Sequence, residues 1–388
     1  MTESSSPTPR IPVSVLILTK NEEQNIDACL RSCAFSDDIV VLDSCSTDAT
    51  RELAAAHPNV RVFERPFDTE YLHRNHGLHA IDYRHPWVYI CDADERVTEN
   101  LAAELHNRAT PDAPESAFQL RYKNMFMGCW LRRATSYPVW IMRLVRPDRV
   151  SYEKRATNVH PEVNGTLRQL DQHFVHYSFN LGMRRWLEKH NYYSTGEAEE
   201  LKRVRDTSFL AETRSAFRGE ITQRRWLKNT SFRVPFRGRV RFVLDYLLRR
   251  GFADGLPGFV YCRLVCLYED WVWLKAKNVT ISDGAEGPRS LEDHLRGIIE
   301  SAFNDDKPEA SPSRFELIVA SMFSPTLYFW SELLLHGRIL RGFPGILEAY
   351  ARSGDRLVGI VARYERAANW PLDYGIPAGE TLYPDAGR

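Results

Sequence analysis

Short apolar runs alternate with segments of helical spacing over the first hundred residues. The runs at 13–18, 38–43, 60–63 and 88–91 have the length and composition of buried strands, and the segments between them repeat apolar residues at helical intervals. Strands that alternate with helices in this way predict a parallel, doubly wound sheet. Ligands of such sheets bind at the carboxyl ends of the strands. The pattern therefore predicts an α/β domain with its site at that edge.

Polar side chains stand at the ends of three of these predicted strands. Thr19 follows the first strand, Asp43 ends the second, and Asp92 and Asp94 follow the fourth. Alternate residues of a strand share a face, so Asp92 and Asp94 are expected to project the same way. Paired carboxylates are ligands for hard cations such as Mg²⁺ and Mn²⁺. A polar loop or a helix cap would explain any one of these residues, but three converging strand ends favour a ligand site.

From residue 181 onward the apolar spacing is helical. The patterns together predict a disordered leader over 1–10, an α/β domain over 11–180, a helical region over 181–280 and an additional helical module over 281–388. Every apolar run falls short of the roughly eighteen residues needed to span a bilayer.

A pattern recurs within the helical part at a constant offset of 87 residues. The segment 255–259, Gly-Leu-Pro-Gly-Phe, corresponds to the segment 342–346, Gly-Phe-Pro-Gly-Ile. Each copy predicts a helix, a Gly-x-Pro-Gly turn and a second helix. We interpret the second copy as a duplicate of the first that widens a membrane-facing or oligomeric surface.

Charge is balanced overall but not locally. The net charge is zero, yet residues 181–250 hold 17 lysines and arginines against 8 acids. Basic residues interleaved with Trp and Phe over 224–242 favour contact with anionic head groups at a membrane interface over stacking on nucleic acid. A solvated helix face is the plain alternative. The seven cysteines form no CxxC pair, which indicates reduced thiols in a cytoplasmic protein.

Four motifs in the first hundred residues carry a resemblance to a known family. LTKNEE (18–23), VLDSCSTD (41–48), RNHGL (74–78) and ICDADE (90–95) resemble, in order and spacing, the nucleotide-sugar domain of family 2 glycosyltransferases. Further likeness is to the bacterial lipopolysaccharide-core and surface-polysaccharide subfamily. The resemblance implies a GT-A fold, followed by a mainly helical C-terminal extension. It also implies inverting transfer from a nucleoside diphosphate sugar, in the first place a UDP-sugar, with Mg²⁺ or Mn²⁺.

The resemblance further implies roles for individual residues on the nucleotide side. Thr19, Glu22 and Asp43 would line the pocket for the base and ribose, and Arg74 would approach the nucleotide. Many family members have a second acid directly after the position of Asp43, where this chain has Ser44. That departure weakens the assignment of the base contact.

The resemblance also implies which residues would hold the metal ion. Asp94 would bind the divalent cation and Asp92 would face the ribose or the metal. His160, in a Val-His-Pro-Glu segment that resembles the subfamily's Val-His-Glu element, could complete the metal shell, because a neutral imidazole ligates cations. A loop histidine bonded to backbone is the alternative for His160. The later His176 is expected to have a structural role.

An inverting transfer needs a general base for the acceptor hydroxyl, and a carboxylate within hydrogen-bond reach suits that task. Glu162 is the candidate, although the inserted Pro161 shifts it by one place from the family pattern. Plain surface charge is the alternative interpretation of Glu162. Asp148 and Glu153 are rival bases.

We therefore expect a cytoplasmic enzyme at the inner face of the cytoplasmic membrane that acts on a lipid-linked, lipopolysaccharide or exopolysaccharide acceptor. Peripheral membrane contact and a homo-oligomer formed through the C-terminal helices are expected, and a nucleic-acid partner is not. Transfer to a protein or a soluble glycan is the alternative within the same class. The departures at Ser44 and Pro161 leave a non-catalytic binding or scaffold protein on a degenerate GT-A fold open.

Overall fold

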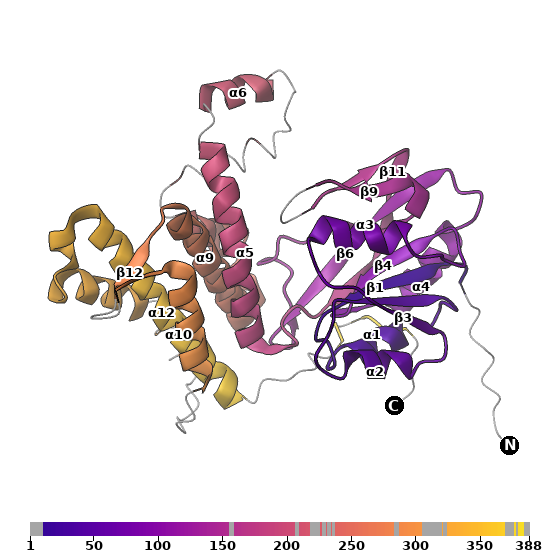
Figure 1. Cartoon of the computed structure of the whole chain (residues 1–388), viewed down its shortest axis with the longest axis horizontal. Coiled ribbons are helices and arrows are strands. Elements are labelled where there is room, and N and C mark those ends of the chain that lie inside the picture. Colours follow the sequence, from indigo (N-terminus) through magenta and orange to yellow (C-terminus); the bar gives the residue numbers. More distant parts are fainter. Residues whose placement is uncertain are drawn as a thin grey trace. The chain divides into compact units, whose positions relative to one another are not determined.

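The computed structural model describes residues 11–154, 159–205, 209–217, 237–282, 287–304, 324–368, 376–377 and 379–383, and the single residues 226, 230, 234 and 320. The chain divides into two compact units (Figure 1). The first unit comprises Met1–Asn180 and Pro371–Arg388, and the second unit comprises Leu181–Trp370. The expected leader, 1–10, and most of the basic segment before residue 237 lie outside the described residues.

A mixed sheet runs through the first unit in the order β3-β2-β1-β4-β8-β6-β11-β5, with β7 paired to β6. Its strands are β1 (Ser14–Thr19), β2 (Ile39–Asp43), β3 (Val60–Glu64), β4 (Val88–Asp92), β5 (Glu95–Arg96), β6 (Glu115–Phe126), β7 (Cys129–Trp130), β8 (Trp140–Val145) and β11 (Thr166–His176). The first four strands along the chain pair in parallel, whereas β8 runs antiparallel between β4 and β6. The predicted alternation of strands and helices and the parallel pairing are confirmed.

The side chains of the parallel strands alternate between two helical layers. The helices of the first unit are α1 (Ile26–Ser32), α2 (Thr50–Ala55), α3 (Glu70–His79) and α4 (Glu99–Arg108). Val15 and Ile17 of β1 are buried in one cluster with Leu30 of α1, whereas Leu16 is buried in another with Leu78 of α3. Figure 1 shows α3 on one side of the sheet and α1 and α2 on the other. The strand period of two thus explains the continuous apolar runs, because both faces are covered.

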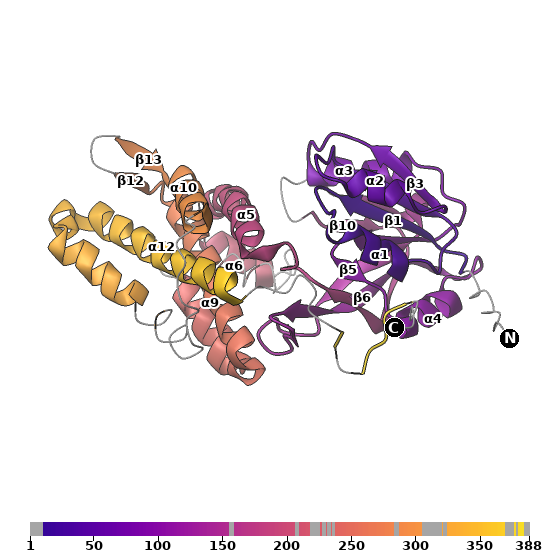
Figure 2. The same cartoon turned by 90° about the horizontal axis from the view of Figure 1, so that it is seen from below.

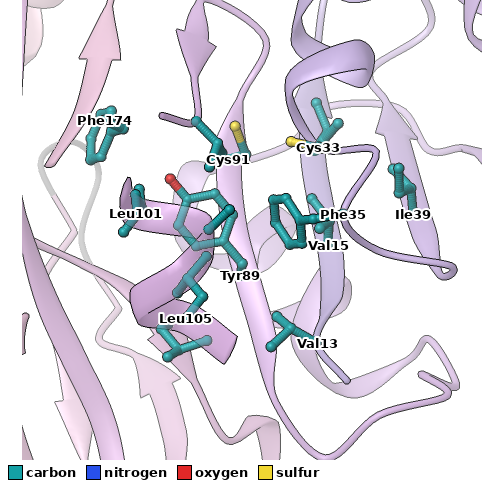
Figure 3. Close-up of a cluster of buried hydrophobic side chains, with 14 of the residues drawn as sticks. Val13, Val15, Cys33, Phe35, Ile39, Tyr89, Cys91, Leu101, Leu105 and Phe174 are labelled. Atoms are coloured by element: carbon teal, nitrogen blue, oxygen red, sulfur yellow. The ribbon is translucent and has the colours of Figure 1, made fainter. Parts of the chain in front are cut away.

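The larger apolar cluster covers the face of the sheet that packs on α1 and α4. Figure 3 shows Tyr89 and Cys91 of β4 beside Phe35 and Cys33. Cys91 Sγ lies 3.7 Å from Cys29 Sγ. All seven cysteines are free and most are buried, in line with the expectation of reduced thiols.

A small hairpin packs against α3 outside the main sheet. Its strands are β9 (Val150–Tyr152) and β10 (Pro161–Val163), which pair in antiparallel fashion after the short helix η1 (Pro147–Arg149). Tyr152 is fixed to α3 by two backbone contacts with Asn75: Tyr152 N donates to Asn75 Oδ1 at 2.8 Å, and Asn75 Nδ2 donates to Tyr152 O at 3.0 Å.

The second unit is mainly helical, and Figure 2 shows the long helix α12 alongside α10. Its elements are α5 (Gly182–Arg205), α6 (Phe209–Phe217), α8 (Arg237–Phe242), η2 (Val243–Leu248), η3 (Gly251–Asp254), α9 (Gly255–Ala276), β12 (Thr280–Ser282), β13 (Pro288–Ser290), α10 (Leu291–Asn304), η5 (Ser331–Leu335), η6 (Arg338–Arg341) and α12 (Gly342–Ala368). Ala198 and Leu201 of α5 pack on Val272 and Ala276 of α9. Within the described residues, every helix is too short or too polar to span a bilayer.

The last described residues belong to the first unit and not to the expected helical module over 281–388. Glu99 N donates to Thr381 O at 2.9 Å, and Tyr383 N donates to Val97 O at 3.0 Å. An extended segment has backbone groups that need partners, and the chain around the start of α4 supplies them.

Candidate active site

Three strand ends meet at the carboxyl edge of the sheet, as the sequence predicts. Thr19 of β1 is the direct partner of Asp43 of β2, and Leu18 is the direct partner of Asp92 of β4. β1 therefore lies between the two acids. The parallel register places Thr19, Asp43 and Asp92 within one edge of three adjacent strands.

Asp43 organises the loop that follows its own strand. Its buried carboxylate accepts a hydrogen bond from Thr19 Oγ1 at 2.8 Å, and from Ser46 N at 2.7 Å and Ser46 Oγ at 2.5 Å. Cys45 in this loop has a φ of 59°, a left-handed conformation that costs a residue with a side chain roughly 1 kcal/mol. The contacts to Asp43 offset that strain and hold the loop in one shape.

The loops after β1 and β2 are joined by further hydrogen bonds. Asn21 N donates to Ser46 Oγ at 2.8 Å, and Glu22 N donates to Thr50 Oγ1 at 2.8 Å. The Glu22 carboxylate accepts from Asn25 Nδ2 at 2.9 Å. Thr19, Glu22 and Asp43 are thus brought together, in a rigid wall made from two of the four motifs.

Ser44 has a specific partner at the position where the family pattern has an acid. Its Oγ lies 3.2 Å from His73 Nε2, and the other ring nitrogen of His73 is 3.2 Å from Arg65 Nη1. Burial, reinforced by the charge of Arg65, lowers the pKa of His73 to about 4. His73 is therefore neutral at pH 7, and Ser44 is a neutral partner for a neutral ring.

Asp92 is held by an arginine from the neighbouring antiparallel strand. Arg143 Nη2 donates to Asp92 Oδ2 at 2.6 Å and also contacts the Glu95 carboxylate. Burial disfavours the charged form of Asp92, but Arg143 and Arg74 outweigh it and lower the pKa of the Asp92 carboxyl. Burial raises the pKa of Glu95 to about 8 in spite of Arg143. At pH 7 the charge of Arg143 is therefore balanced chiefly by Asp92.

Arg74 lies on the same side of the sheet as Asp92. Its guanidinium stands 5.5 Å from the centre of the Tyr152 ring, and its Nε donates to Glu70 Oε1 at 3.2 Å. Arg74 contributes to the lowered pKa of Asp92. The α3 layer thus supplies a positive charge next to this corner.

Asp94 has a histidine beside it. His176 Nε2 lies 3.3 Å from Asp94 Oδ2, and Tyr177 N donates to the backbone oxygen of Asp94 at 2.8 Å. Burial opposes protonation of His176, but the charge of Asp94 outweighs it and raises the pKa of the imidazole. His176 ends β11, which pairs with β5 directly after the acids. The structure therefore places His176 at the corner where the sequence suggested His160.

His160 and Glu162 lie on the small hairpin formed by β9 and β10, with His160 directly before β10. Both side chains are exposed. Glu162 pairs with Ser151 across the hairpin, one residue away from the Pro161–Tyr152 pair. Because successive residues of a strand face opposite ways, Glu162 points away from the face that carries Tyr152. Glu162 and His160 are thus not shown to join Asp92 and Asp94, and their roles stay predictions.

The corner offers a defined chemistry. Asp92 and Asp94 present hard oxygen ligands that are partly open to solvent, backed by Arg143 and His176. Sequence reasoning gave no role to Arg143 and only a structural one to His176. A signal for Arg143 was available, because a single charge inside an apolar strand such as 140–145 requires a buried partner.

Comparison with known proteins agrees with the motifs. Residues 14–191 match the family model described as Glycosyl transferase family 2. The lipopolysaccharide core biosynthesis glycosyltransferase LpsC of Rhizobium meliloti (strain 1021) is 30% identical over 97 residues, which cover 24% of this chain and 35% of that relative. The chain thus matches about a third of the length of this curated relative.

Solved structures with some similarity have low scores. Glucosyl-3-phosphoglycerate synthase from Mycobacterium tuberculosis, in complex with Mn²⁺, UDP and glucosyl-3-phosphoglycerate, is 23% identical, with 29% of this chain and 44% of that chain covered and a TM-score of 0.25. S. aureus TarS 1-349 is 14% identical, with 76% and 92% covered and a TM-score of 0.30. Neither score supports an inference about this chain. The motifs, the sheet and the family match agree over residues 14–191, which match the glycosyl transferase family 2 model, have the mixed α/β sheet of a GT-A fold and are followed by a mainly helical region.

Proposed function

We propose that this chain transfers a sugar, with inversion, from a nucleoside diphosphate sugar to a lipid-linked or polysaccharide acceptor at the inner face of the cytoplasmic membrane. The observation that carries the proposal is the corner formed by Asp92 and Asp94. Two carboxylates at a carboxyl edge, paired with Arg143 and His176, suit a diphosphate and its cation. The match to family 2 supports a sugar nucleotide as the donor.

A divalent cation, Mg²⁺ or Mn²⁺, fits the residues at this corner. Both carboxylates are hard oxygen ligands, both are partly exposed, and the lowered pKa keeps Asp92 ionised. Asp94 and Asp92 would hold the ion. When bound, it would neutralise the charge that develops on the departing diphosphate.

The chain's own residues prepare this site before any ligand arrives. Arg143 keeps Asp92 charged and fixes its Oδ2, which leaves the other oxygen for a ligand. The loops joined through Asp43 form a rigid wall beside it, where Thr19 and Glu22 would meet the base and ribose. Arg74 adds positive charge toward the nucleotide. Preorganised groups of this kind need no rearrangement when charge develops.

Fewer structural observations support the proposed acceptor and the proposed base. The printed name of the Rhizobium meliloti relative, a lipopolysaccharide core glycosyltransferase, supports an acceptor of that class. We retain Glu162 as the proposed base, because the carboxylates of Asp43, Asp92 and Asp94 are engaged in the donor corner. The donor is proposed to be a UDP-sugar.

A thermal-shift panel tests the donor proposal. The full chain is melted with UDP-, GDP- and dTDP-sugars, each with and without Mn²⁺, since a ligand that binds the native state raises the melting temperature. We expect UDP-sugars to raise it only when Mn²⁺ is present. Slow, Mn²⁺-dependent release of sugar from the same donor separates an enzyme from a scaffold. A chain that neither shifts with any donor nor hydrolyses one is no transferase.

A further inference from the structure

The second unit contains the same hairpin twice. We call residues 237–276 the first hairpin and residues 324–368 the second hairpin. Each runs from a short helix into a π-helix, a 3-10 helix and a long α-helix. The turns match in detail, because Gly255 has φ 67° and ψ −147° where Gly342 has φ 64° and ψ −148°. The repeat predicted from sequence is confirmed as a repeat of conformation.

The glycines of the repeat are required by close backbone approach. A Cβ atom on Gly258 would lie 2.3 Å from Gly251 O, and one on Gly345 would lie 1.9 Å from Arg338 O. Real Cβ atoms do not approach backbone oxygen so closely. Both hairpins therefore have a tightly folded, rigid tip.

Each tip presents apolar side chains to solvent at equivalent positions. Five pairs, 87 residues apart, are exposed in both copies: Val240 and Leu327, Val243 and Trp330, Leu247 and Leu334, Leu248 and Leu335, Phe252 and Ile339. The exposed fraction reaches 71% for Leu248 and 82% for Leu335. Isolated exposed apolar residues are ordinary on protein surfaces, but a set of five repeated in two copies is not.

The exposed charged side chains around these apolar sets are arginines, most of which pair with buried acids. Arg241, Arg249 and Arg250 are exposed in the first hairpin, and Arg341 is exposed in the second. The acids of the same turns are turned inward, since Asp245 is buried and accepts from Arg249 Nη1 at 2.7 Å. The equivalent acid of the second hairpin, Glu332, is likewise buried against Arg338, 2.7 Å away.

We propose that both hairpin tips are interfacial anchors that insert their apolar side chains into the outer part of an anionic lipid leaflet. Exposed leucines, a Trp and surrounding arginines suit this environment, because apolar groups reach the acyl boundary while guanidiniums meet anionic head groups. Among the described helices, each is too short or too polar to span a bilayer. The proposal holds whatever reaction the first unit performs.

A bilayer fits this surface better than a protein partner. A protein partner would have to match two tips whose side chains differ at three of the five equivalent positions. For example, the second tip has Trp330 where the first has Val243. A lipid surface accepts any apolar side chain that reaches the acyl boundary. It therefore requires an exposed apolar residue at each position and not a particular residue type. All five pairs keep that character; three of them differ in shape between the copies, and the other two are leucine in both.

Co-sedimentation of the full chain with lipid vesicles tests the proposal. The vesicles are phosphatidylglycerol mixed with phosphatidylethanolamine, compared with phosphatidylcholine alone. The variants are Leu247→Gln with Leu248→Gln, Leu334→Gln with Leu335→Gln, and all four together. We expect each pair to lower partitioning on the order of tenfold and the fourfold variant to abolish it. The wild type should prefer the anionic vesicles.

Matched controls separate lipid contact from folding and from the donor site. Leu53→Gln and Leu167→Gln replace exposed leucines of the first unit and should leave partitioning unchanged. The UDP-sugar thermal shift should be the same in every variant, so a failed donor proposal leaves this test intact. If the fourfold variant melts early, Arg250→Gln serves instead, with a roughly fivefold loss on anionic vesicles only.

Two results would overturn the proposal. One is equal partitioning of the wild type and the fourfold variant on anionic vesicles. The other is a wild-type oligomer that dissociates in the leucine variants, measured by light scattering without lipid, while vesicle binding is unchanged. That second result would make the tips an interface between copies of this chain.

Discussion

The two ends of the parallel strands in the first unit carry buried or half-buried aspartates with opposite surroundings. At the amino end, Asp38 is 1% exposed and both of its oxygens are occupied: Oδ1 by Arg61, and Oδ2 by Ser14 Oγ and Arg84 N. At the carboxyl end, the Asp92 side chain is 32% exposed. Among the described contacts of that carboxylate, Arg143 binds through Oδ2.

The difference separates an acid that holds the fold from an acid that is available to a ligand. Asp38 has no remaining acceptor site to offer, since each oxygen is already hydrogen-bonded inside the protein. Asp92 keeps an oxygen and a third of its surface open, and its charge is secured by Arg143. The same residue type thus serves stability at one edge and, as proposed, ligand binding at the other.

Replacing Arg143 by Met challenges this separation most strongly, because Arg143 both stabilises the fold and keeps Asp92 charged for a ligand. The variant leaves Asp92 and Glu95 without their cation, and removal of one partner from a buried ion pair typically costs about 3–5 kcal/mol. We expect the free energy of unfolding to fall by that amount in urea titrations, and the donor-induced thermal shift to vanish. Arg149→Met, which removes an exposed ion pair with Asp148, is the control and should cost less than about 1 kcal/mol.

Replacing Asp94 by Asn sharpens the comparison. The substitution removes a cation ligand but leaves a side chain of the same shape beside His176, so we expect Mn²⁺-dependent release of sugar from the donor to fall about 10²–10³-fold. The melting temperature without ligands should stay within a few degrees of the wild type. Undiminished release would remove Asp94 from the proposed metal site.

Replacing Glu162 by Gln probes the acceptor side. We expect transfer to acceptor to fall at least about 100-fold, as for loss of a general base, while the donor-induced thermal shift is unchanged. Glu153→Gln removes a rival base, and transfer by that variant should stay near the wild-type rate if Glu162 is the base. Normal turnover in Glu162→Gln would agree with the outward direction of its side chain and reassign the base.

The sequence predicted which strand ends meet at the edge of the sheet. It did not predict the contacts that set the charge states of the acids there. Strand ends at Thr19, Asp43 and Asp92 follow from local apolar periodicity, and parallel pairing brings such ends together. The partners Arg143 and His176 come from β8 and β11, whose antiparallel pairing with β4 and β5 depends on register across many residues. Periodicity carries no register, so the partners of these two residues could be identified only in the folded chain, although the single charge of Arg143 inside an apolar strand did indicate a buried partner.

The hairpin repeat was predictable for the same reason that the strand ends were. Gly-x-Pro-Gly is a local signal with a steric cause at Gly258 and Gly345. The exposure of Leu248 and Leu335 was not predictable, because a helical apolar stripe ordinarily faces a core. The fold decides which part of such a stripe stays uncovered.

Replacing Asp38 by Asn tests the structural end of the comparison. The amide can no longer accept on both oxygens from Ser14, Arg61 and Arg84, and its NH₂ group would face donors in a buried site. We expect a loss of about 2 kcal/mol in the free energy of unfolding. The donor-induced thermal shift should be retained, which is the reverse of the result expected for Asp94→Asn. A lost donor shift would show that the two ends are coupled.

The pH dependence of the stability lost in Asp38→Asn is the smallest and most specific effect that we predict. Burial alone would raise the pKa of Asp38, but hydrogen bonds from Arg84 N and Ser14, and the charge of Arg61, lower it below its ordinary value. A lowered folded-state pKa contributes stability that is fully present above the unfolded value, near 3.9, and is lost as pH falls through the folded value. The amide of the Asp38→Asn variant does not titrate, so the gap in the free energy of unfolding between wild type and variant should narrow by about 1 kcal/mol between pH 6 and pH 3. Urea titrations of both proteins at the two pH values measure it, and a gap that widens toward acid would mean that Asp38 is already protonated in the folded chain.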